Sequence, residues 1–115
     1  MKLTIPDVPP SLNKVLRMHW VKQGKLFSDW RWLVRAQIQK LPIMARLKKQ
    51  VIITLHHSRF YDKDNAYGAV KPLVDALKHW KLIYDDTAEY LDLIVEQEKC
   101  SHKNRRTEIY LEPMS

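Results

Sequence analysis

Five aspartates gather in one short stretch of a chain that is basic elsewhere. The stretch, "YDKDNAYGAVKPLVDALKHWKLIYDD", covers residues 61–86 of a 115-residue chain whose formal net charge is +7. Carboxylates repel phosphate unless a metal ion lies between them, and hard cations such as Mg²⁺ take oxygen ligands. The stretch therefore indicates a metal site that meets phosphate, although aspartates are also common in turns and at helix N-termini. The five are Asp62, Asp64, Asp75, Asp85 and Asp86.

Asp62 and Asp64 are the first pair of candidate metal ligands. If residues 62–64 are extended, the two side chains point to the same side and can face one ion. Asp85 and Asp86 follow a helical stretch and the short segment "KLIY", which could return one of them to the first pair. Such a site of two or three carboxylates is typical of enzymes that cleave phosphodiesters.

Lys71 is the candidate for a catalytic cation. Lys71, Asp75 and Lys78 recur at i, i+4 and i+7, so we expect them to share one helix face. A lysine one turn before an aspartate is usually a simple surface pair. Beside a metal and a phosphate, the same ammonium could stabilise charge in the transition state.

Charge is divided unevenly along the chain. Residues 1–59 hold twelve Lys/Arg and two Asp, which gives 12 − 2 = +10. Residues 60–115 hold eight Lys/Arg and eleven Asp/Glu, which gives 8 − 11 = −3. This is either a solvated basic surface or a surface for nucleic acid.

The hydrophobic pattern predicts one mixed α/β domain over residues 1–115, in the order β-α-β-α-β-β around one mixed sheet. Ser28 is expected to cap a helix that runs to about Lys40, after a turn at Gly24. A second helix buries Val70, Leu73, Val74, Leu77 and Trp80, with Pro72 near its start. The expected strands are residues 2–5, 50–56, 90–97 and 107–112.

Composition also bears on membrane association and on the expected cellular compartment. No apolar run approaches the roughly 18–20 residues that span a bilayer, so we expect no membrane partner. The first residues have no apolar segment of a secretory signal, and the only cysteine, Cys100, fits a reducing cytoplasm.

Taken together, the motifs resemble those of the RusA-type Holliday-junction resolvases. That family carries D-x-D-N, then a lysine and an aspartate four residues apart, then D-D eleven residues after the helix aspartate. Here these elements read "DKDN" at 62–65, "KPLVD" at 71–75 and "YDD" at 84–86, and "PPSLNK" at 9–14 is similar to the family's P-P-S-x-N. The spacing from Asp64 to Lys71 is seven residues, where the family usually has four.

The resemblance implies roles for particular residues. It implies that Asp62, Asp64 and Asp86 bind metal and are catalytic, with Lys71 as an electrostatic helper. Residues expected to support these ligands are Asp85, Asp75 and Asn65. Residues expected to contact DNA are Asn13, Lys14, Arg17, Arg59 and Lys63.

The resemblance also implies an activity, a cofactor and an assembly. These are a crossover junction endodeoxyribonuclease that depends on Mg²⁺ (with Mn²⁺ as a substitute), a partner in branched, four-way DNA, and an intertwined homodimer. Paired symmetric nicks would serve DNA recombination and repair in the bacterial cytoplasm, for a chromosomal or a phage protein. Two alternatives stay open: a DNA-binding protein of the same fold that does not cut, and a nuclease for other branched DNA such as flaps or forks.

Overall fold

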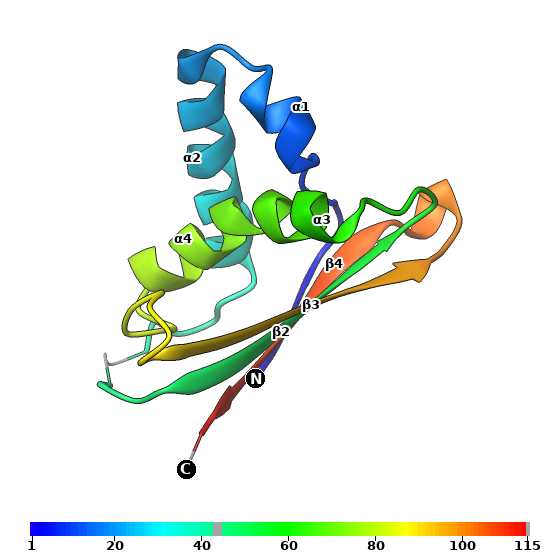
Figure 1. The fold of residues 1–115 in the computed structure, drawn as a ribbon. Coiled ribbons are helices and arrows are strands. Elements are labelled where there is room, and N and C mark those ends of the chain that lie inside the picture. The colour runs from blue at the N-terminus through cyan, green and yellow to red at the C-terminus, as the bar shows by residue number, and fades with distance from the viewer. Residues whose placement is uncertain (43–44, 115) are drawn as a thin grey trace.

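One mixed four-stranded sheet with helices on one of its faces forms the frame of the molecule (Figure 1). The computed structural model describes residues 1–42 and 45–114. The strands are β1 (Lys2–Ile5), β2 (Lys49–His57), β3 (Leu91–Lys99) and β4 (Arg106–Pro113). The helices are α1 (Leu12–Leu16), α2 (Trp20–Ala36), α3 (Lys63–Ala69) and α4 (Lys71–His79), with a short 3₁₀ turn, η1 (His102–Asn104).

The strand order across the sheet is β1-β4-β2-β3. β2 and β3 are parallel and are connected through α3 and α4, because a parallel pair needs a crossover. β4 runs antiparallel to both β1 and β2. The prediction of a mixed α/β domain around one mixed sheet is confirmed, and α1 and α3 are additional elements.

β2 is the central strand that its composition predicts. Val51, Ile53 and Leu55 point to the helical side and are fully buried. Thr54 and His56 are buried on the opposite side, between β3 and β4. Branched side chains on both faces explain why a nearly continuous apolar run forms a strand here.

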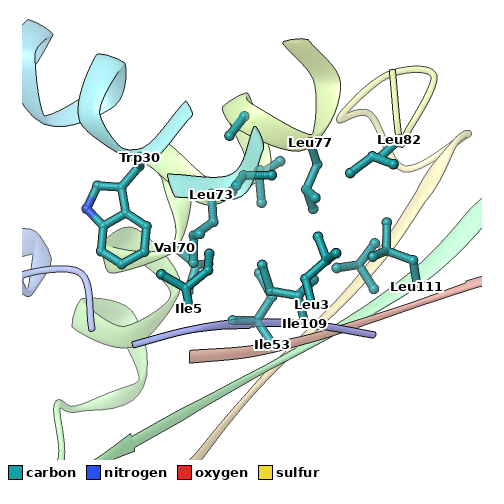
Figure 2. Packing of buried hydrophobic residues seen from close by; sticks show 14 of the residues in the cluster. Leu3, Ile5, Trp30, Ile53, Val70, Leu73, Leu77, Leu82, Ile109 and Leu111 are labelled. Atoms are coloured by element: carbon teal, nitrogen blue, oxygen red, sulfur yellow. The ribbon is translucent and has the colours of Figure 1, made fainter. Parts of the chain in front are cut away.

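The core lies between the sheet and helices α2 and α4 (Figure 2). Leu73 and Leu77 of α4 and Trp30 of α2 belong to one buried cluster with Ile53 and Ile109 of the sheet, and Leu73 is the one drawn nearer to Trp30. The predicted buried face of the second helix is confirmed: its apolar residues are buried and Trp80 is half-buried. Pro72 occupies the first turn of α4, where its missing N–H costs nothing.

The predicted start of the first long helix is wrong. α2 begins at Trp20 with His19 as its N-cap, and Ser28 lies inside it. The helix continues through Gly24 because half-buried apolar residues on both sides of Ser28 extend the same stripe. That packing outweighs the cost of about 1 kcal/mol for an interior glycine. The predicted end near Lys40 is also late, since Gln37 is the C-cap.

Among the described residues, no helix combines the length and apolar character needed to cross a membrane.

Candidate functional site

A pocket of about 620 Å³ collects charged residues from separate parts of the chain. We call it the aspartate pocket. Its charged lining comes from α3, from α4 and from the loop that leads into β3. Those residues are Asp64, Lys71, Asp75, Lys78 and Asp86. Apolar residues from all four helices and from β3 complete it: Leu12, Phe27, Tyr67, Gly68, Val70, Val74, Leu91 and Leu93.

The expectation that residues 62–64 are extended is wrong. Helix α3 begins at Lys63, and Asp62 is its N-cap, so only Asp62 has extended backbone angles. The two carboxylates therefore do not share one side of a strand. Asp64 lines the aspartate pocket, whereas Asp62 is not among its lining residues. The local reason is that the Asp62 side chain accepts a hydrogen bond from the backbone N–H three residues later, and an aspartate that does so is a strong helix N-cap.

Asn65, the asparagine that follows the two aspartates, forms hydrogen bonds with both Asp62 and α1. Its backbone N–H donates to Asp62 Oδ1 at 2.9 Å, and its side-chain Nδ2 donates to Asp62 Oδ2 at 3.0 Å. Its Oδ1 accepts from the backbone N–H of Asn13 at 2.8 Å. Asn65 thus fixes the orientation of the Asp62 carboxylate and also ties α3 to α1.

Lys71 reaches the same pocket as Asp64 although their spacing is longer than in the family. Lys71 is the first residue of α4, directly after the C-cap of α3 at Val70. Only Val70 separates the two helices, so the seven-residue spacing still brings Lys71 to the lining of the pocket that Asp64 lines. Lys71 is exposed and forms no ion pair with any described residue. Its ammonium is thus available to an anion.

Asp75 is held by an arginine of α2. Arg31 Nε donates to Asp75 Oδ2 at 2.8 Å, and Nη2 donates to Oδ1 at 3.4 Å. The hydrogen bond that Arg31 donates to Asp75 raises the pKa of Arg31 above its ordinary value. Asp75 thus joins α4 to α2 at the aspartate pocket, and its expected role in supporting the metal ligands stays a prediction.

Lys78 contacts both residues of the D-D pair. Its Nζ lies 3.0 Å from Asp85 Oδ1 and 3.8 Å from Asp86 Oδ1. Asp85 Oδ1 also accepts from the backbone N–H of Asp86 at 2.8 Å. The hydrogen bond from Lys78 lowers the pKa of Asp85, and the same bond raises the pKa of Lys78. Asp85 therefore stays ionised and positions the loop that carries Asp86.

The donor set of the pocket suits Mg²⁺ held by few protein ligands. Asp64 and Asp86 offer carboxylate oxygens to one pocket. Magnesium is commonly bound by one or two carboxylates, with waters and substrate phosphate as its other ligands. In residues 1–42 and 45–114, no group of three or more His, Cys, Asp or Glu side chains is arranged to hold a metal. The pocket thus fits a site completed by substrate better than a closed site made of protein ligands.

The residues expected to contact DNA lie on neighbouring elements. Asn13 and Lys14 are in α1, Arg17 is its C-cap, Arg59 follows β2, and Lys63 begins α3. All five are exposed. α1 packs against α3, and each of these helices contributes a residue, Leu12 or Asp64, to the lining of the aspartate pocket.

Two features of the site were not predicted from the sequence. The pairing of Lys78 with Asp85 and Asp86 was indicated only in part by the sequence, where the spacing of Lys78 places it on the same helix face as the candidate catalytic residue Lys71. The bond from Arg31 to Asp75 had none, because it joins positions 44 residues apart.

A scan against models of known protein families finds no match, and a search of curated proteins finds no relative.

Proposed function

We propose that this protein is a Mg²⁺-dependent endodeoxyribonuclease of the RusA type that cuts four-way DNA junctions. The observation that carries the proposal is the joint presence of Asp64, Asp86 and Lys71 in one pocket, on elements that are apart in the sequence. The D-x-D-N, K-x-x-x-D and D-D motifs, in the family's order, support the same activity.

Asp64 and Asp86 are the proposed ligands of Mg²⁺. When bound, the ion supplies charge neutralisation at the scissile phosphate and activation of the attacking water. Lys71 is proposed to contact the same phosphate and to stabilise negative charge as it develops. Asp62 stays a predicted third ligand, and Asn65 orients its carboxylate in the way that outer residues orient metal ligands.

The basic surface on α1 and around the start of α3 is proposed to hold the DNA. Its cations are exposed and lie on α1 and around the start of α3, and each of these helices also contributes a residue, Leu12 or Asp64, to the lining of the aspartate pocket. They can therefore position a strand near that pocket. A homodimer is proposed because a four-way junction has two equivalent strands to be cut, and a two-fold dimer presents two equivalent sites.

The test is cleavage of a labelled mobile four-way junction with and without Mg²⁺. We expect paired symmetric nicks with Mg²⁺ or Mn²⁺ and none in EDTA, with a much lower rate on linear duplex. Asp64→Asn is the matched inactive control. Equal rates on flaps or forks would favour a nuclease for other branched DNA.

The second candidate is a DNA-binding protein of the same fold that does not cut. It is favoured by two observations: Asp62 acts as a helix cap and Asp85 is paired with Lys78. Binding of the junction without any cleavage, in either metal, would support it over the nuclease.

A further inference from the structure

A second pocket, of about 430 Å³, lies beyond α1 from the aspartate pocket. The two pockets share no lining residue, and α1 contributes Leu12 to the first and Lys14 to the second. Three segments form the second pocket: α1 with the residues just before and after it, the end of β2 with the residues that follow to Tyr61, and the turn between β3 and β4.

The charge of this second pocket is entirely positive. Lys14, Arg59 and Arg105 line it, together with the imidazoles of His57 and His102, and none of its lining residues is acidic. We therefore call it the basic pocket. Lys14 and Arg59 form no ion pair with any residue in the described part of the chain. Their charges are thus uncompensated.

Arg105 has donor capacity that the protein does not use. Its Nη2 is 3.4 Å from the carbonyl oxygen of Val8 and 3.5 Å from Asp7 Oδ1, both of which are long contacts. Its Nε is buried without a hydrogen-bond partner among the described residues. A buried donor without a partner is unfavourable, so an acceptor that draws the guanidinium into a new geometry would relieve this cost.

A hydrogen-bond network joins the segments that line the pocket. Gln97 forms two hydrogen bonds with the backbone of Tyr61. Its Oε1 accepts from the Tyr61 N–H and its Nε2 donates to the Tyr61 carbonyl, each at 2.8 Å. Because Oε1 only accepts, His57 Nε2, at 2.9 Å from it, must carry a proton. The Tyr61 hydroxyl donates to the Pro9 carbonyl at 2.9 Å and closes the pocket against the N-terminal loop.

We propose that the basic pocket is a phosphate-binding site that holds a backbone phosphate of the DNA strand. Planar guanidinium groups bind phosphate with two hydrogen bonds, and lysine adds a point charge. That the phosphate belongs to DNA rests on the proposed function. A phosphate held beyond α1 would fix the register of the strand and so select which phosphodiester enters the aspartate pocket.

The first experiment tests phosphate binding without metal, DNA or cleavage. Inorganic phosphate is titrated into the full chain at constant ionic strength, and backbone amide shifts are followed by NMR. We expect saturable shifts at Ser11, Ser58 and Arg105, and their loss in the double variant Lys14→Gln/Arg59→Gln. The control double variant Lys22→Gln/Lys40→Gln removes the same charge from exposed positions outside all the pockets and should keep the shifts. Absent shifts, or equal loss in both variants, would overturn the proposal.

The second experiment separates a strand phosphate from free phosphate. Junction binding is measured against salt in EDTA, where no cleavage occurs. The pocket variant should reduce the slope of log K against log salt by about 0.9, the contribution of one phosphate contact, whereas the control should leave it unchanged. Phosphate binding with a slope equal to that of the control would overturn the assignment to DNA. A protein that binds as expected but never cuts would contradict the proposed nuclease and leave the basic pocket in place.

Discussion

Asp62 and Asp64 are two positions apart, yet the fold gives them different surroundings. Both oxygens of Asp62 accept hydrogen bonds from Asn65, whereas Asp64 lines the aspartate pocket together with Asp86. The sequence predicted both residues as metal ligands on one extended segment. The motif is compatible with such a segment and also with a helix N-cap at Asp62, because both have the same local pattern of polar residues.

We predict that Asp64→Asn abolishes cleavage and leaves junction binding equal or tighter. The substitution keeps the shape of the side chain but removes a metal ligand and one source of phosphate repulsion. The loss of rate should exceed about 100-fold, since even residues that only orient metal ligands contribute 10–100-fold. Single-turnover cleavage and binding in EDTA measure the two effects. Asp62→Asn is the comparison, because asparagine is an equally good N-cap. Cleavage by Asp64→Asn at the wild-type rate would remove it from the site.

Lys71→Ala should slow cleavage far more than it weakens binding. One ammonium among twenty basic residues matters little to affinity, but at the scissile phosphate its loss should reduce the single-turnover rate by about 100-fold. Lys22→Ala, which removes an exposed lysine of α2 outside the aspartate pocket, is the control. An unchanged rate for Lys71→Ala would exclude the role proposed for it.

Lys78→Met should raise the pKa of Asp85 back toward its ordinary value of about 3.9. The hydrogen bond from Lys78 is the main cause of the lowered pKa in the folded protein. Because this pKa is lowered by folding, its contribution to stability is present above the unfolded pKa and is lost as pH falls through the folded pKa. Carboxyl-carbon NMR titration measures the shift. Lys71→Met, on the same helix but unpaired with Asp85, should leave this pKa unchanged.

At the scale of elements, the sequence predicted strands better than helix boundaries. Residues 50–56 have a branched apolar pattern that fits only a buried strand, and β2 covers them. Helix boundaries depend on contacts that local patterns do not contain. Ser28 has the side chain of a good cap, but α2 already begins at Trp20, where the His19 side chain is the N-cap and accepts from the Val21 N–H. The aspartate pocket could not be predicted for the same reason, because its lining residues come from separate elements that only tertiary packing brings together.

The two glycines test how packing modifies helix propensity, since both lie within helices. A Cβ on Gly24 would meet no atom within 4 Å, so Gly24→Ala should stabilise the protein by about 0.5–1 kcal/mol. A Cβ on Gly68 would lie 2.5 Å from Leu12 Cβ, so Gly68→Ala should destabilise it by about 1–3 kcal/mol and displace α1 from α3. Urea unfolding of both variants measures the difference. Equal effects would mean that α1 does not pack closely on α3.

At the scale of the molecule, the face of the sheet that no helix covers, here called the open face, differs in charge from the rest of the protein. Side chains alternate along strands, so the face away from the helices is defined by the register of the four strands. Five acidic and two basic residues lie on it, giving 2 − 5 = −3, and the remainder of this +7 chain therefore carries 7 + 3 = +10. The seven are Asp92, Glu96, Glu98, Glu108, Glu112, Lys2 and Arg106. DNA should therefore approach the helical side, where both pockets lie.

Binding of a four-way junction should weaken steeply with salt. The exposed cations on α1 and around the start of α3 would displace counterions from several phosphates, and each contact adds about 0.9 to the slope of log K against log salt. Fluorescence anisotropy in EDTA, from low to physiological salt, measures this slope without cleavage. Glu96→Gln/Glu98→Gln is an informative control, because it makes the chain more basic on the open face only. It should leave the slope unchanged if DNA lies on the helical side. A flat salt dependence for the unaltered protein would mean that its basic residues serve solubility alone.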